Sequence, residues 1–196
     1  MVFEGGEGSG KSTQARLLAQ RWGALLTFEP GDTRIGVELR QILLDPSHPD
    51  IDPRAEALLM AADRAQHVAE VLRPALNRGR DVVCDRFTGS SLAYQGHARG
   101  LGVAEVNQLS TFATDGLSPD LVVLLEVSPE EAQTRLLAIG NQDRVEALGA
   151  DFHARVAEGY RMLAAHDPDH WLCLDGSGSM DVVAERIASA VEARLP

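Results

Sequence analysis

A glycine-rich segment near the N-terminus restricts the fold of this chain more than any other feature. Residues 5–13 read GGEGSGKST, and they satisfy the pattern GxxxxGK[ST] from Gly5 to Ser12. Glycines allow the backbone to wrap around a phosphate with its N–H groups pointing inward, where a strand passes into a helix. The apolar run before this segment and the amphipathic run after it have the required character. The pattern therefore predicts a P-loop in an α/β protein.

The same loop predicts a site for the phosphates of ATP or GTP. A helix that begins near Lys11 presents its positive N-terminal end to the phosphates. Lys11 is the only lysine of the chain. Its ammonium can reach the β- and γ-phosphates, and the Ser12 hydroxyl can bind Mg²⁺. A dinucleotide GxGxxG loop is excluded, because Thr13 stands where the third glycine belongs. The residues that we expect to bind the triphosphate are Gly5, Gly8, Ser9, Gly10, Lys11, Ser12 and Thr13.

Strand-like and helical patterns alternate along the chain. Short apolar runs predict strands at 1–4, 24–28, 81–84, 121–127 and 171–174. Helical patterns occupy 11–22, 35–44, 53–78, 103–115, 129–138, 149–164 and 180–194. This alternation predicts a doubly wound parallel sheet of five strands with helices on both faces, in a three-layer α/β/α arrangement. We expect one domain over residues 1–196, with a lid at about 139–148, where the periodicity is weak.

Composition argues against several other classes of protein. A formal net charge of −11 disfavours a general nucleic-acid-binding protein, which needs a basic surface against phosphate. No apolar run approaches the ~20 residues of a membrane span, and no export signal precedes the first strand. Cys84 and Cys173 lie far apart and form no CxxC pair. We therefore expect reduced thiols, a cytoplasmic location, and neither a membrane nor a nucleic-acid partner.

A second polar cluster, Asp85-Arg86-Phe87, lies at the carboxyl end of a predicted strand. Open α/β sheets bind their ligands at this edge, and an arginine there can form a bidentate contact with the phosphate of an acceptor substrate. Taken alone, this cluster could also be a strand-end salt bridge. Together with the P-loop, it favours a kinase over a motor, signalling or translocating ATPase.

The order and spacing of several segments resemble those of the bacterial thymidylate kinases. These segments are FEGGEGSGKST (3–13), EPGDT (29–33), ELRQILLD (38–45), ADRAQHV (62–68), CDRFTGSSLAYQGHARGLG (84–102), PDLVVLLEV (119–127) and DRVE (143–146). The resemblance covers nearly the whole chain, and 84–102 is its most specific part. It implies the P-loop kinase fold, a homodimer formed through helix 53–78, and transfer of the γ-phosphoryl group of Mg·ATP to dTMP.

The resemblance also implies roles for individual residues around the acceptor nucleotide. Arg86 and Arg40 would hold its phosphate, and Arg64 would form a hydrogen bond with the thymine base. Tyr94 would crowd the position of a ribose 2′-hydroxyl and so favour deoxyribose. The remaining implied contacts are those of Glu7 with the 3′-hydroxyl and Mg²⁺, of Asp85 with the magnesium shell, of Met60 with the base, and of Ser91 and Gln95 with the base and phosphate.

Some positions depart from the family pattern. Phe28 stands where the family usually has an arginine, and Met60 stands where it commonly has a phenylalanine. Bacterial members without an arginine in the P-loop generally carry several in the lid, whereas 135–144 retains only Arg135 and Arg144 at its ends. We expect one of these two arginines to supply the missing charge as a catalytic residue, and we favour Arg144. The first strand is also shorter than usual, which leaves open where the natural chain begins.

Two alternatives stay open at this stage. The first is a kinase for another nucleoside monophosphate, or for a deoxynucleoside. The second is a nucleotide-binding protein that kept the pocket and lost the chemistry. The arginine-poor lid supports this second alternative, whereas the retained Lys11, Asp85 and Arg86 speak against it.

Overall fold

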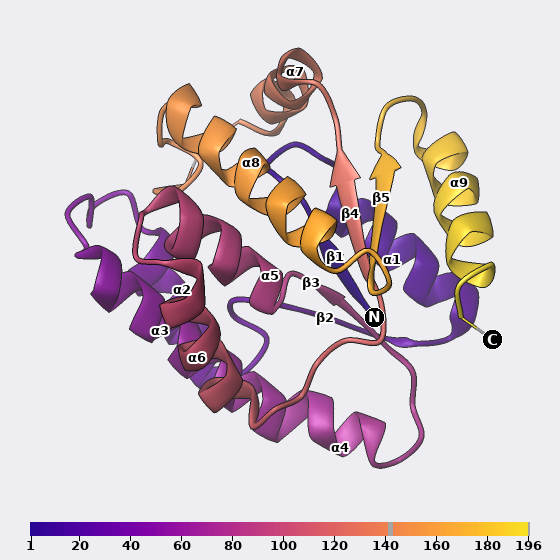
Figure 1. Ribbon diagram of the computed structural model, residues 1–196, viewed down its shortest axis with the longest axis horizontal. Helices are drawn as coiled ribbons and strands as arrows, with labels where there is room; N and C mark the ends of the chain where they lie inside the picture. The colour runs from indigo at the N-terminus through magenta and orange to yellow at the C-terminus, as the bar shows by residue number, and fades with distance from the viewer. Residues whose placement is uncertain (141–142, 196) are drawn as a thin grey trace.

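The computed structural model describes residues 1–140 and 143–195, and its centre is a five-stranded sheet (Figure 1). The strands are β1 (Val2–Glu4), β2 (Leu25–Phe28), β3 (Val82–Asp85), β4 (Val122–Glu126) and β5 (Trp171–Asp175). They lie in the order β2-β3-β1-β4-β5, and every neighbouring pair is parallel. Because the strands are parallel, their carboxyl ends meet at one edge, with the end of β1 in the middle.

Helices connect the strands and cover both faces of the sheet (Figure 1). The α-helices are α1 (Lys11–Trp22), α2 (Arg34–Leu44), α3 (Pro53–His67), α4 (Arg73–Leu76), α5 (Thr88–Ser91), α6 (Val103–Thr114), α7 (Pro129–Ile139), α8 (Ala150–His166) and α9 (Met180–Glu192). Two π-helical segments, η1 (Val68–Leu72) and η2 (Leu92–Ala98), continue α3 and α5. Within the described residues, no helix has both the length and the apolar composition that a membrane span requires.

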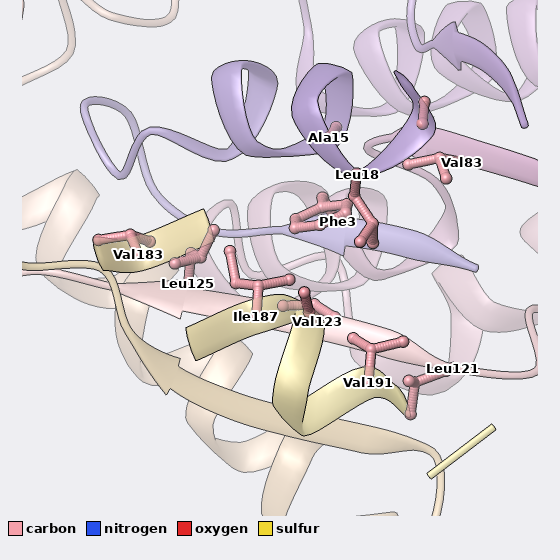
Figure 2. Packing of buried hydrophobic residues seen from close by; sticks show 12 residues of the cluster. Phe3, Ala15, Leu18, Val83, Leu121, Val123, Leu125, Val183, Ile187 and Val191 are labelled. Atoms are coloured by element: carbon pink, nitrogen blue, oxygen red, sulfur yellow. The ribbon is translucent and has the colours of Figure 1, made fainter. Parts of the chain in front are cut away.

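Alternating side chains along each strand build the core on the first face of the sheet, because successive residues of a strand point to opposite sides. Phe3, Val83 and Val123 point to the face that α1 and α9 cover (Figure 2). There they pack with Leu18 of α1 and Ile187 of α9, and all five side chains are almost completely buried. The P-loop therefore lies between two elements, β1 and α1, that this core holds firmly.

The opposite face of the sheet carries two further clusters. Val2 and Cys84 pack against Leu72 of η1, while Leu124 packs against Tyr160 of α8. Since side chains of β4 are buried on both faces, the nearly continuous apolar run at 121–127 has a direct explanation. The predicted parallel sheet with helices on both faces is confirmed.

The predicted elements form, with differences at several ends. All five predicted strands are present, and α1 has the predicted bounds. The helix predicted over 53–78 was wrong in detail, because the π-helical η1 interrupts it and α4 ends at Leu76. The helical segment 88–98 is not predicted by the sequence pattern, since its glycines and serines are weak helix formers. Packing of Ala93 and Tyr94 against α8 stabilises this segment instead.

The predicted lid at about 139–148 is described only in part, because residues 141 and 142 lie outside the described residues. On its C-terminal side, the backbone N–H of Arg144 donates to the carbonyl of Leu44 at 3.0 Å. This contact joins the segment after residue 142 to the end of α2. Closure of the lid over a bound nucleotide stays a prediction.

Candidate active site

The P-loop connects the end of β1 to the start of α1. Gly5, Gly8 and Gly10 have φ angles of 151°, 74° and 87°, which favour glycine. A Cβ atom at Gly8 would lie 2.5 Å from the carbonyl oxygen of Ala132, and one at Gly5 would lie 2.6 Å from that of Leu125. Among the described residues no side chain caps the N-terminus of α1. Its first N–H groups are therefore available to an anion.

Lys11 lies in the first turn of α1 and is buried against the loop. Its ammonium donates to the carbonyl of Gly6 at 3.4 Å and lies 3.6 Å from Oε2 of Glu7. Burial lowers the pKa of the Lys11 ammonium, and Arg86 beside it acts in the same direction, whereas Glu7 raises it. Both contacts of the ammonium are within the P-loop, so a bound phosphate can replace them without moving another element.

Ser12 and Asp85 line one cavity and offer oxygen atoms for a metal ion. Ser12 is exposed at the start of α1. Oδ1 of Asp85, at the end of β3, is buried and has no hydrogen-bond partner among the described residues. A buried carboxylate oxygen without a donor is costly, and hydroxyl and carboxylate oxygens are ligands that Mg²⁺ prefers. The residues present therefore fit a magnesium ion and its water shell.

Arg86 follows β3 directly and has a left-handed backbone conformation, with a φ angle of 71°. Its backbone N–H donates to the carbonyl of Phe3 at 2.9 Å, which ties it to the neighbouring strand β1. Nη1 of the side chain donates to the carbonyl of Gly5 at 3.2 Å, to Oγ of Ser90 at 3.1 Å and to the hydroxyl of Tyr160 at 3.2 Å. A non-glycine residue in this conformation is strained, and such strain is typical of functional sites.

Glu7 lies on the other side of the Arg86 guanidinium. Oε1 of Glu7 accepts a hydrogen bond from Nη2 of Arg86 at 2.5 Å and one from the hydroxyl of Tyr94 at 2.8 Å. Burial alone would raise the pKa of the Glu7 carboxyl, but Arg86 and Lys11 beside it outweigh this effect and lower the pKa to about 2. Glu7 is therefore ionised at neutral pH and can accept hydrogen bonds from a ligand.

One cavity of about 240 Å³ joins these P-loop residues to the residues that the family resemblance assigns to the acceptor nucleotide. The predicted site residues in its lining are Glu7, Lys11, Ser12, Arg40, Met60, Arg64, Asp85, Arg86, Ser91, Tyr94 and Gln95. These side chains come from the P-loop, α2, α3, the end of β3, α5 and η2. The fold thus collects into one cavity residues that are up to 88 positions apart in the sequence, from Glu7 to Gln95.

Arg64 lines the same cavity and is held by three protein groups. Nε donates to Oε2 of Glu29 at 2.8 Å, Nη1 to Oγ of Ser91 at 3.0 Å and Nη2 to the carbonyl of Phe87 at 2.9 Å. A guanidinium has five N–H groups, so each terminal nitrogen of Arg64 keeps one for a ligand. The ion pair with Glu29 thereby orients Arg64 without using up its donors.

Arg40 and Phe28 line the same cavity. Nη1 of Arg40 donates to the carbonyl of Pro30 at 2.7 Å, and the guanidinium lies over the ring of Phe28 at 5.9 Å from its centroid. Phe28 occupies the position at which the family usually has an arginine. Relative to the family pattern, Phe28 leaves the cavity with one cation fewer. It also gives the Arg40 guanidinium an aromatic ring to lie over.

Four buried carboxylates around the cavity are missing from the sequence prediction: Glu4, Glu29, Glu56 and Asp63. Asp63 is an example of a buried carboxylate whose hydrogen bonds are incomplete. Its Oδ1 accepts from the backbone N–H of Gly31 at 3.1 Å, and its Oδ2 has no partner among the described residues. Burial raises the pKa of the Asp63 carboxyl to about 6, with Glu29 adding to the effect. An acidic residue on an otherwise apolar strand or helix face is the sequence feature that could have identified them.

Arg144 lies at the start of the segment after residue 142 and contacts α2 and α3. Its side chain is buried, with Nε donating to the carbonyl of Leu43 at 2.7 Å and Nη2 to Oε2 of Glu56 at 2.7 Å. Its charge is therefore already balanced by a buried carboxylate, and it does not line the cavity. In this position the side chain holds the base of the lid segment, and the predicted catalytic role of Arg144 stays a prediction.

Arg135 of α7 lies behind the P-loop. Nη1 donates to the carbonyls of Gly8 at 3.3 Å and Ser9 at 3.1 Å, while Nη2 donates to Oε1 of Glu131 at 2.6 Å and to the carbonyl of Gly176 at 2.9 Å. These bonds join α7 and the loop after β5 to the loop that is predicted to hold the triphosphate. Arg135 is thus close to the predicted phosphate site.

Comparisons with known proteins agree with this geometry. The family model described as thymidylate kinase matches residues 3–187. A thymidylate kinase of Cutibacterium acnes is 47% identical over 201 residues, covering 100% of this chain and 97% of that protein. A thymidylate kinase of Roseiflexus castenholzii is 44% identical over 213 residues, covering 100% and 93%. The crystal structure of thymidylate kinase from Ehrlichia chaffeensis superposes with a TM-score of 0.79 at 26% identity and covers 97% of this chain and 96% of that one. The chain belongs to the thymidylate kinase family.

Proposed function

We propose that this chain is a thymidylate kinase that transfers the γ-phosphoryl group of Mg·ATP to the 5′-phosphate of dTMP, giving dTDP and ADP. One observation carries the proposal most directly. A single cavity joins Lys11 and Ser12 of the P-loop to Arg86 and Arg64, so a donor and an acceptor nucleotide can meet end to end. Family membership supports the same reaction.

The transfer needs positioning and charge neutralisation more than a dedicated base. A phosphate oxygen of dTMP is already a competent nucleophile near neutral pH, so no group has to remove its proton. Lys11 and the N–H groups of the P-loop would hold the donor phosphates, and Arg86 would hold the acceptor phosphate in line with them. Arg86 is suited to this task because five protein groups already orient its guanidinium.

We assign the magnesium ion to Ser12 and Asp85. The ion held there would supply positive charge that neutralises part of the charge developing on the donor phosphates. The exposed hydroxyl of Ser12 would bind the ion, and the unpartnered Oδ1 of Asp85 would accept from its water shell. ATP and Mg²⁺ are thus the cosubstrate and cofactor that the residues fit.

The acceptor end of the cavity has the polarity that a thymine base requires. Arg64 can donate to a base carbonyl with the N–H groups that remain free. Gln95 donates its amide N–H to Oε1 of Glu56 at 2.9 Å, so its amide oxygen is left for the N3–H of the base. Met60 lines the same space and would pack against the ring, and Tyr94 would exclude a ribose 2′-hydroxyl.

Arg135, rather than Arg144, is the lid-end arginine that we propose to support the transferring phosphate. Its bonds to the carbonyls of Gly8 and Ser9 place its positive charge directly behind the P-loop. Arg144 instead pairs with Glu56 at a distance of 2.7 Å. The arginine-poor lid is therefore compatible with turnover, because Lys11, Arg86 and Arg135 surround the phosphates.

We also propose that the chain acts as one domain and as a homodimer in the cytoplasm. Leu58 of α3 is 57% exposed and Phe112 of α6 is 86% exposed, and these two helices pack side by side. Exposed large apolar side chains on adjacent helices favour contact with a second copy. Among the described residues, Cys84 and Cys173 are both free thiols, as expected in a reducing compartment.

Production of ADP from Mg·ATP, measured with dTMP, with UMP and without acceptor, tests the proposed function. We expect dTMP-dependent turnover that falls by about a thousandfold or more in Lys11→Ala and Arg86→Ala. Faster turnover with another monophosphate would reassign the acceptor. Tight binding of ATP and dTMP without ADP formation would show that the pocket has lost its chemistry.

A further inference from the structure

Glu4 is a buried carboxylate beneath the active site, at the end of β1. Its Oε1 accepts from the backbone N–H groups of Phe87 at 3.0 Å and Ser90 at 2.9 Å. Its Oε2 accepts from Oγ of Ser90 at 2.6 Å and from the hydroxyl of Tyr160 at 2.9 Å. All four of these donors are neutral groups, and burial raises the pKa of the Glu4 carboxyl. Within the described residues Glu4 has no ion-pair partner closer than 4.0 Å.

The two hydroxyls that donate to Glu4 also contact Arg86. Nη1 of Arg86 donates to Oγ of Ser90 at 3.1 Å and to the hydroxyl of Tyr160 at 3.2 Å. A hydroxyl has one proton, and a guanidinium has donors but no acceptor. Both hydroxyls can therefore accept from Arg86 only when their own protons point elsewhere. The two hydroxyl oxygens lie 2.9 Å apart, so one proton at most can be shared between them, whereas Oε2 of Glu4 lies within reach of both protons, at 2.6 Å from Ser90 and 2.9 Å from Tyr160.

Resting on the proposed function, we propose that Glu4 is a positioning residue for phosphoryl transfer, acting on Arg86 through Ser90 and Tyr160. By accepting both hydroxyl protons, Glu4 turns the oxygen lone pairs toward Nη1 of Arg86. Glu7 and Tyr94 hold Nη2 from the other side. Together these contacts fix the plane of the guanidinium, and a fixed plane keeps its positive charge in one place relative to an acceptor phosphate.

The two carboxylates next to Arg86 therefore have different tasks. Glu7 contacts the guanidinium directly and balances its charge. Glu4 does not contact it, and instead sets the direction of two protons. Oε1 of Glu4 secures the start of α5 through backbone donors, which is a structural contribution. Only Oε2 connects to Arg86, so a change confined to that atom separates the two contributions.

The substitution Glu4→Gln makes this change. The amide oxygen can still accept from the two backbone N–H groups, whereas the amide nitrogen in place of Oε2 must donate. One hydroxyl proton can then be donated to the other hydroxyl, 2.9 Å away, but the second is directed toward Arg86, where it opposes the guanidinium donors. We expect kcat to fall by about tenfold or more and KM for dTMP to rise, while KM for ATP stays within about twofold of wild type.

A double-mutant cycle with Arg86→Ala distinguishes positioning from a general effect on the fold. If Glu4 acts through Arg86, adding Glu4→Gln to Arg86→Ala should leave the residual rate unchanged within about twofold. Multiplicative losses would overturn the proposal. The exposed Glu185, which pairs with Arg21, provides Glu185→Gln as a control for the loss of one carboxylate.

Tyr160→Phe keeps the test decisive if Glu4→Gln folds poorly, and the double variant adds a second test if it folds well. Tyr160→Phe alone should raise KM for dTMP, because it removes one acceptor of Arg86. Combined with Glu4→Gln, Tyr160→Phe should recover part of the lost rate, because it removes a misdirected proton. A further loss in the double variant would overturn the proposal. If wild type itself phosphorylates no monophosphate, the proposed function fails; if wild type is active and Glu4→Gln equals it, only the role of Glu4 fails.

Discussion

At the scale of single residues, the site depends on buried carboxylates that orient cations. Glu29 holds Arg64, and Glu7 holds Arg86, in both cases at hydrogen-bond distance. Breaking a buried pair leaves an uncompensated charge, so each carboxylate constrains its arginine strongly. Asp63 differs from these residues, because one of its oxygens has no partner among the described residues. Its ionisation should therefore cost stability.

The pH dependence of stability should reveal the cost of ionising Asp63. The carboxyl has a pKa raised from 3.8 to about 6 in the folded chain, so the fold holds its proton more tightly than the unfolded chain does. The cost is absent below about pH 4 and fully present above about pH 6, where it amounts to about 3 kcal/mol. Asp63→Asn keeps an acceptor for Gly31, and its stability relative to wild type should rise by this amount from pH 4 to pH 8.

Urea unfolding at several pH values measures this difference. The exposed Asp50, changed to asparagine, is the matched control for the loss of one carboxylate. A stability difference between Asp63→Asn and wild type that stays constant over this pH range would show that Asp63 ionises freely in the fold.

At the scale of elements, close contacts shape the P-loop and the base of the lid. Gly8 touches α7 so closely that a Cβ atom would lie 2.5 Å from the carbonyl of Ala132. Arg144 connects the segment after residue 142 to α2 and α3 through Leu43 and Glu56. Each contact joins two elements that are distant in sequence. A single substitution should therefore be enough to disrupt it.

Gly8→Ala should displace the P-loop from α7. The φ angle of 74° and the contact with Ala132 both oppose a side chain at this position. We expect KM for ATP to rise by about tenfold or more, since strain of this kind costs about 1–3 kcal/mol. Gly6→Ala is the matched control, because no atom lies within 4 Å of a Cβ atom there. Equal kinetics for the two variants would contradict this account of the loop.

Arg144→Ala should act on stability. Removing the guanidinium breaks a buried pair with Glu56, which typically costs about 3–5 kcal/mol, and Arg99, which also pairs with Glu56 at 2.9 Å, should keep the loss at the lower end of this range. Arg161→Ala, which breaks an exposed pair with Glu126, should cost less than about 1 kcal/mol and is the control. Urea unfolding checks both values. A stable Arg144→Ala enzyme with a large loss of kcat would restore Arg144 as the lid arginine that contacts phosphate.

At the scale of the whole molecule, several positively charged side chains gather in the cavity although the chain as a whole is acidic. The net charge is −11, yet the cavity lining includes Lys11, Arg40, Arg64 and Arg86. A small anionic ligand can bind such a local cluster even though the surrounding protein is acidic. The exposed Leu58 and Phe112 form the other feature of this scale, because the proposed homodimer rests on them.

Phe112→Glu should prevent dimer formation. A carboxylate at the centre of an apolar contact would be buried without a partner, which is strongly unfavourable. Light scattering after size exclusion should give a dimer for wild type and a monomer for Phe112→Glu. Met162→Glu changes a 55% exposed apolar residue on α8 and is the control. If the wild-type protein is a monomer, the proposal of a homodimer is wrong.

The sequence alone determined the P-loop, the five strands and the bounds of α1. These features depend on short contiguous stretches: glycines that allow positive φ angles, and apolar periods that match a strand or a helix. Family resemblance then added the residues that are proposed to bind the acceptor, including Arg64 and Tyr94. The helical segment 88–98 was not predicted. It is stabilised by packing against α8 and not by the intrinsic helix propensity of its residues.

Only the tertiary structure decided which side chains pair with one another. Arg144 pairs with Glu56 across 88 positions, and Glu4 reaches Tyr160 across 156. No local pattern specifies such pairs, because many carboxylates compete for each arginine until the fold brings one of them close. Burial then strengthens the chosen contact and makes an unpaired group costly. The phosphate-binding pattern of the P-loop thus depends on contiguous residues. The orientation of Arg86 and the position of Arg144 depend on the complete fold.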